Sequence, residues 1–203
     1  EEQCMGGREC PGGIPPSPPA SIGNRRLELT LKIYPNSTMP NVHYIWFRFF
    51  DANTNQTLHH ITFFLHITNQ SQLLFYELFH THTGILEIRF ISTSGTKWYV
   101  TGDREPILGG WMPYKDDEPV TVHAPMFNDT KATYHFNVQI RTIDQDNNLF
   151  NITDAPVFDF YLNMKEQNQT ITTPNITVPE FPFVIPVLLM GITIAAIFKR
   201  NLS

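Results

Sequence analysis

The sequence predicts an all-β chain, in which an antiparallel, immunoglobulin-like β-sandwich is followed by one C-terminal transmembrane helix. From residue 27 onward, apolar residues alternate with polar ones in about nine short runs, separated by clusters of Asn, Asp, Ser, Thr and Gly. No stretch before residue 181 keeps the 3.6-residue period of an amphipathic helix. Residues 181–198 then form an uncharged, mostly apolar run.

Residues 1–26 form a leader rich in Gly, Pro and Ser, a composition that does not build a packed core. The leader holds the only two cysteines of the chain, Cys4 and Cys10. In an oxidising compartment, two cysteines with five residues between them most simply form a small disulfide loop. A thiolate metal site is the alternative, although two thiolates alone do not complete a coordination shell.

Residues 27–164 are predicted to form the β domain, which is long enough for a core of its own. Aromatic residues make up 13% of the chain and include sixteen Phe, so the core is expected to be Phe-rich. Both cysteines lie in the leader, so the disulfide that bridges antibody domains is absent here. The strands are predicted at 27–33, 42–50, 60–68, 73–78, 85–91, 97–100, 120–123, 134–143 and 157–162.

The segment 101–119 interrupts this rhythm and is predicted to be a long functional loop. Trp111, Met112 and Tyr114 are of types enriched at the centres of interfaces, so the loop is predicted to contact a partner through them. Alternatively, Trp111 folds back as a plug over one end of the sandwich.

The chain carries eight Asn-x-Ser/Thr sequons, whereas its content of Asn, Ser and Thr predicts about two by chance. This excess predicts N-glycosylation outside the cell, although turns also favour these residue types. The predicted glycosylation sites, all before the apolar run, are Asn36, Asn55, Asn69, Asn128, Asn151, Asn168 and Asn175.

Histidines are the strongest candidates for metal chemistry. Residues i and i+2 of a strand share a face, so His80 and His82 could clasp one ion. Imidazole with thioether suits copper, which adds His123 and Met126 to the candidate ligands. By the same parity, His60 and His66 share a face. Alternatively, 79–84 is a turn whose histidines bond to backbone. A cupredoxin site is excluded because it needs a cysteine within the sandwich.

Residues 165–180 are predicted to form a polar stalk, and 181–203 a membrane anchor. An eighteen-residue helix is about 27 Å long, just enough to cross a hydrocarbon core. The basic pair Lys199-Arg200 follows the apolar run, which predicts a cytoplasmic C-terminus and an extracytoplasmic domain. A buried core helix is the alternative interpretation of the run.

Two stretches carry a resemblance to known proteins. The tail "PEFPFVIPVLL" followed by Lys199-Arg200 resembles archaeal PEF-type C-terminal sorting signals, in a form typical of ammonia-oxidising archaea. "LLFYELFHTHTGILEIRF" and "APVFDFYL" resemble secreted or membrane-anchored β-domain proteins of the same organisms. The resemblance implies a cell-surface address and, by association, a membrane complex such as ammonia monooxygenase as a partner.

The net charge of −5 argues against nucleic-acid binding, and no phosphate loop, nucleophile elbow or zinc-protease motif is present. The chain is therefore predicted to be non-catalytic. The predicted function is that of a glycosylated accessory subunit or cell-surface interaction protein, whose partners are the lipid bilayer and membrane-complex or cell-surface proteins. The alternative is an extracytoplasmic protein that binds or delivers copper.

Overall fold

The structure is a computed structural model that describes residues 3–4, 8–9, 19–22, 25–129, 131–144, 150 and 155–164. All of these residues belong to the first of the two units into which the chain divides, 1–169. Among them, no helix is both long enough and apolar enough to cross a membrane. The predicted stalk and anchor at 165–203 lie outside the described residues, as do Cys10, Asn151, Asn168 and Asn175.

One sheet, sheet I, has seven strands in the order β10-β13-β9-β5-β4-β3, with β6 paired to β5. Its long central strands carry the alternating or continuous apolar runs that the sequence shows. The bounds are β3 Ala20–Ile22, β4 Arg25–Pro35, β5 Val42–Asp51, β6 Gln56–Thr57, β9 Ile85–Ser92, β10 Tyr99–Thr101 and β13 Val120–Ala124.

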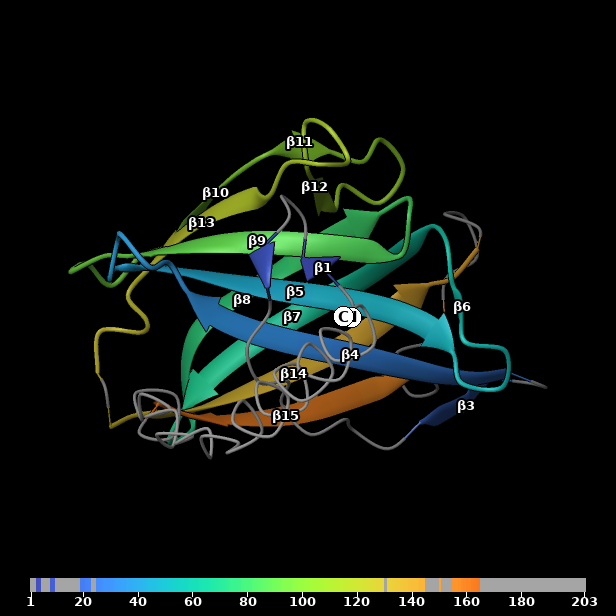
Figure 1. Cartoon of the computed structure of the whole chain (residues 1–203), viewed down its shortest axis with the longest axis horizontal. Coiled ribbons are helices and arrows are strands. Elements are labelled where there is room, and N and C mark those ends of the chain that lie inside the picture. The colour runs from blue at the N-terminus through green and yellow to red at the C-terminus, as the bar shows by residue number, and fades with distance from the viewer. Residues whose placement is uncertain are drawn as a thin grey trace, which may run out of the picture. The chain divides into compact units, whose positions relative to one another are not determined.

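The other sheet, sheet II, has six strands in the order β11-β12-β8-β7-β14-β15. In Figure 1, strands of sheet I cross in front of the strands of sheet II. The bounds are β7 Ile61–Asn69, β8 Gln72–Thr81, β11 Asp103–Arg104, β12 Trp111–Met112, β14 Thr133–Thr142 and β15 Val157–Asn163. In addition, β1 (Gln3–Cys4) pairs with β2 (Arg8–Glu9).

The mostly-β class and the nine predicted strands are confirmed, but the purely antiparallel pairing is wrong. Strand β13 runs parallel to β9, and β12 runs parallel to β8, so both sheets are mixed. After β9 the chain passes through β10 in sheet I and through β11 and β12 in sheet II before β13 returns beside β9. A connection of this length lets a strand return in the same direction as its neighbour, which a tight hairpin cannot do.

The two sheets pack through a core of Phe and aliphatic side chains, as the composition predicts. Phe63 of β7 meets Phe47 and Phe49 of β5, with ring centroids 5.4 and 5.0 Å apart. All three side chains are fully buried. Offset and tilted ring pairs at these separations add to the free energy of burying their apolar surface. The Phe-rich core therefore holds β5 against β7 near the segment that connects these two strands.

The outer face of sheet I carries a second buried cluster, formed by Tyr34, Val42, Tyr44 and Trp46. The Tyr34 hydroxyl donates a hydrogen bond to the carboxylate of Glu87, which is also buried. Strand β5 is therefore buried on both faces over most of its length, and this explains why its sequence is a nearly continuous apolar run.

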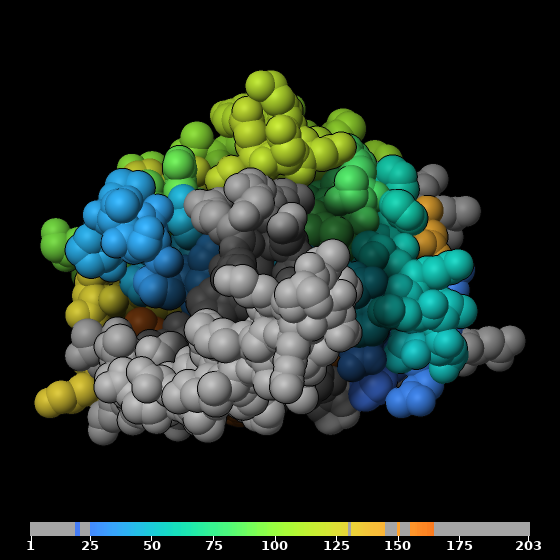
Figure 2. Space-filling view, viewed as in Figure 1, coloured from blue at the N-terminus to red at the C-terminus, as the bar shows by residue number. Residues whose placement is uncertain are grey.

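The predicted loop 101–119 contains the short strands β11 and β12, which form a hairpin at the edge of sheet II. In Figure 2, the yellow-green residues near position 110 project at the top of the view. The hairpin brings Gly110 and Trp111 beside the end of β8. This placement matters for the candidate site, because His80, the penultimate residue of β8, is buried there.

Candidate metal centre

His80 is the fixed member of a three-histidine cluster. It lies near the end of β8, opposite Thr62 of β7, and both residues are fully buried. Thr62 Oγ1 lies 2.8 Å from His80 Nδ1, within hydrogen-bonding distance. Gly110 packs on the residue so closely that a Cβ built there would lie 3.1 Å from His80 Cβ. Strand pairing, a side-chain hydrogen bond and this close backbone contact together hold the ring in place.

His60 and His82 come from the segments that flank the paired strands β7 and β8. His60 directly precedes β7 and has a φ of 49°, a left-handed conformation that histidine adopts more readily than most residues. Its amide donates a hydrogen bond to the carbonyl of His82, with an N···O distance of 3.1 Å. Both side chains are partly buried. The backbone thus brings the two residues together directly across the end of the β7–β8 hairpin.

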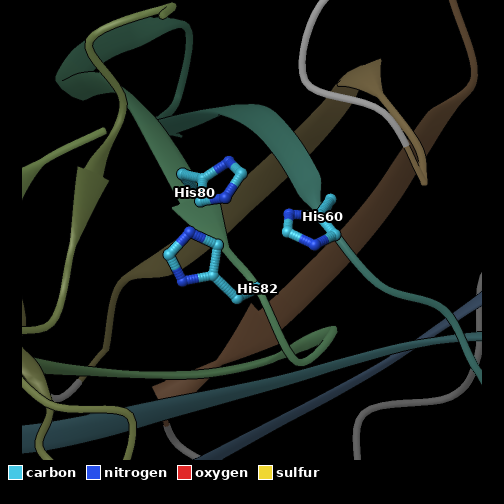
Figure 3. Close-up of side chains that lie close together, drawn as sticks. All are labelled: His60, His80 and His82. Carbon is cyan, nitrogen blue, oxygen red and sulfur yellow. The ribbon is translucent and has the colours of Figure 1, made fainter. Parts of the chain in front are cut away.

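The three rings lie around a common space (Figure 3). One ring nitrogen from each histidine lies within 4.8 Å of the corresponding nitrogen of the other two. The ring centroid of His82 is 4.8 Å from that of His80 and 5.3 Å from that of His60. Three ligands on one ion, each about 2.0–2.1 Å from it, would bring their nitrogens to about 3.4 Å from one another. The cluster therefore has the composition of a metal site, and its nitrogens must approach one another by up to about 1.4 Å to close around an ion.

The chemistry of the ligands restricts which ions could bind. Three imidazoles suit copper, zinc, nickel or iron, whereas calcium and magnesium prefer oxygen ligands. Nδ1 of His60 and Nε2 of His80 are shielded from solvent, which favours a desolvated ion held by nitrogen. A three-histidine set also leaves one coordination position for water or an incoming ligand.

The structure brings together the predicted pair His80 and His82, but it does not add His123 and Met126 to them. The cluster adjoins the Ile85 end of β9, whereas the segment that carries His123 and Met126 lies at the Ser92 end. Seven steps of about 3.3 Å along a strand separate these ends by about 23 Å.

The other predicted ligands make their contacts elsewhere in the fold. The ring of His123 stacks on Tyr99 with centroids 4.2 Å apart, and Met126 is buried in the core. Burial, and then the charge of Arg89, lower the pKa of His123 below its usual range. His66 packs edge-on against Tyr76 instead of joining His60.

The residues predicted to form an interface divide into two kinds. Trp111 is half-buried, with Arg104 stacked 3.4 Å from its ring centroid and its Nε1 donating to Glu77 across 3.3 Å. Glu77 also accepts a hydrogen bond from Trp98, so Trp111 belongs to a network that ties the β11–β12 hairpin to β8. Met112 is half-buried, whereas the Tyr114 side chain is 64% exposed.

Four of the predicted glycosylation sites are described. Asn55 lies exposed in the turn before β6, and Asn128 is exposed with its amide donating to the carbonyl of Thr93. Asn36 and Asn69 are partly buried.

His60 is the site residue that the sequence interpretation did not join to the others, although a signal for it was present. The turn 69–71 between the predicted strands implies that residues near 60 and 82 face each other across the hairpin.

Comparisons of this chain with protein-family models, curated proteins and solved structures found no match. The proposed chemistry therefore rests on the geometry of the three histidines.

Proposed function

We propose that this domain binds a transition-metal ion, copper, through His60, His80 and His82. The observation that carries the proposal is the convergence of three imidazoles from separate points of the chain onto one space. One of them, His80, is buried, and its Nδ1 lies within hydrogen-bonding distance of Thr62 Oγ1. A partner on the distal nitrogen is the usual means by which proteins orient a histidine ligand and raise its basicity.

Copper is favoured by the uncharged ligand set and by the order of metal affinities. Nitrogen sites bind copper(II) more tightly than the other divalent first-row ions, and imidazole also accepts copper in its lower oxidation state. Because His60 and His82 are only partly buried, an ion could reach the cluster from solvent. An accessible site with three protein ligands fits a protein that takes up or passes on copper.

The proposal is tested by titrating the full chain with copper(II) in competition with a chelator of known affinity. We expect one ion per chain, with binding lost in the variant His80→Ala/His82→Ala. The matched control is His123→Ala/His135→Ala, which removes two histidines that lie outside the cluster and should keep binding. Equal loss in both double variants, or full retention in the first, would refute the assignment.

A second candidate is the accessory or interaction role, in which the protein is a non-catalytic, N-glycosylated, membrane-anchored subunit. The observation that favours it is the exposure of Tyr99, Ile107 and Tyr114, whose side chains are 58%, 57% and 64% exposed. Tyr is among the residue types enriched at the centres of protein interfaces. Native co-purification with Tyr114→Ala should lose the partner while the fold is kept; unchanged co-purification would count against this role.

The finer description of the architecture is also a proposal. Two sheets packed around a Phe-rich core support an immunoglobulin-like sandwich. The uncharged run 181–198 followed by Lys199-Arg200 supports a transmembrane helix and an extracytoplasmic domain. Protease added to intact cells should digest the domain, and full protection would contradict this location.

A further inference from the structure

Two connections between the sheets meet at the histidine cluster. Strand β6 pairs with β5 in sheet I and β7 belongs to sheet II, so residues 58–60, the first crossover, pass from one sheet to the other. Strand β8 belongs to sheet II and β9 to sheet I, so residues 82–84, the second crossover, return the chain. His60 lies in the first crossover and His82 in the second, whereas His80 lies in the rigid strand between them.

The two crossovers are in direct backbone contact. Both are hydrogen-bonded to the backbone of Phe49 in β5. The amide of Leu58 donates to the carbonyl of Phe49 across 3.0 Å, and the amide of Phe49 donates to the carbonyl of Gly84 across 2.9 Å. Gly84 has a φ of +74°, and a Cβ added there would lie 1.7 Å from the carbonyl oxygen of Leu58. Only glycine permits this approach, so the backbone is shaped to hold the crossovers side by side.

The three ligands differ in how far they can move. His80 is fixed within β8, by its hydrogen bond to Thr62 and by the packing of Gly110. His60 and His82 lie outside the strands and are partly exposed. Because the crossover backbones are already in contact, the approach of up to about 1.4 Å that an ion requires comes mainly from rotation of the His60 and His82 side chains toward His80.

We infer that a copper ion acts as a latch that ties both crossovers to β8, so that loading with metal controls the local opening of this end of the domain. The inference rests on the proposed function, and it adds that the ion regulates how readily the two sheets separate here. An ion that binds only the closed arrangement suppresses opening in proportion to its concentration above the dissociation constant. The metal-loaded and metal-free states would thus differ in how often the two crossovers, residues 58–60 and 82–84, open.

Hydrogen exchange of the full chain, measured by mass spectrometry with and without copper(II), tests the latch. At a free copper concentration 100 times the dissociation constant, amides of both crossovers should exchange about 100-fold more slowly. The tip of the β4–β5 hairpin, residues 36–41, is the internal control and should not change. In His82→Ala the copper-dependent slowing at 58–60 should disappear.

Copper binding is measured on the same samples, so that two failures can be told apart. If copper binds but slows exchange at neither crossover, or at only one, the latch is refuted and the metal-binding proposal stands. If no copper binds, the proposed function fails and the latch fails with it. Wild-type slowing in His82→Ala would also refute the latch, because the second crossover would then contribute no ligand.

Discussion

Replacing Thr62 by Val removes the hydroxyl that holds His80 and nearly preserves the shape of the side chain. Thr62 Oγ1 lies 2.8 Å from His80 Nδ1, and both residues are fully buried. Thr142, which faces Thr62 across the pairing of β7 with β14, is a matched control because it is equally buried. Among the described residues, Thr142 Oγ1 has no hydrogen-bond partner.

The expected magnitudes follow from this difference. Removing one partner of a buried hydrogen bond costs about 1–3 kcal/mol, so Thr62→Val should lower the melting temperature by about 3–10 °C. Loss of the group that orients a histidine ligand should also weaken copper binding by about 10–100-fold. Thr142→Val replaces an unsatisfied buried hydroxyl with a methyl group, so it should leave stability unchanged or raise it by about 1 kcal/mol.

Thermal unfolding without metal and competitive copper titration of both variants provide the assay. Equal changes in stability for Thr62→Val and Thr142→Val would show that the hydrogen bond to His80 contributes nothing. Unchanged copper affinity in Thr62→Val would show that this bond does not orient a metal ligand.

Three further predictions concern stability. Gly84→Ala should destabilise the fold by about 3 kcal/mol or more in chemical denaturation. Gly95→Ala is the control and should be nearly neutral, because no atom lies closer than 3.9 Å to the new Cβ. Similar effects of the two substitutions would contradict the close contact of the crossovers. Trp111→Ala should lower the free energy of unfolding by about 3 kcal/mol, whereas Tyr114→Ala should change it by less than about 0.5 kcal/mol. The opposite order would favour the prediction that Trp111 contacts a partner. Burial lowers the pKa of His43 from 6.5 to about 4, so the unfolded chain takes up the proton first as the pH falls. The free energy of unfolding should therefore fall by about 3 kcal/mol between pH 6.5 and pH 4. His43→Leu should flatten this part of the plot of stability against pH, and an unchanged slope would refute the assignment.

Strand positions were predictable because alternation and turn residues report directly on local structure. The run from Leu27 to Ile33 has one apolar face and became the inner face of β4. Pairing direction was not predictable, since it depends on where the chain travels between β9 and β13. The outer cluster at Tyr34 and Trp46 was also missed, because a strand buried on both faces loses its alternation.

The candidate site was predicted in part for a similar reason. The spacing of His80 and His82 is local, so parity along one strand suggested that they could bind together. Adding His60 requires the register of β7 against β8, and excluding His123 requires knowing at which end of β9 it lies. Both are properties of the assembled sheets. Thr62 could not be singled out at all, because nothing in the sequence distinguishes it from the other threonines of the strands.

X-ray absorption spectroscopy at the copper edge, on the full chain loaded with one equivalent of copper, tests the central claim most directly. The account predicts a first shell with three imidazole nitrogens at about 2.0 Å, together with the outer-shell scattering typical of histidine. The signal should be lost in His60→Ala/His80→Ala/His82→Ala. A spectrum dominated by oxygen or sulfur ligands, or one that is unchanged in the triple variant, would contradict the assignment of this cluster as the metal site.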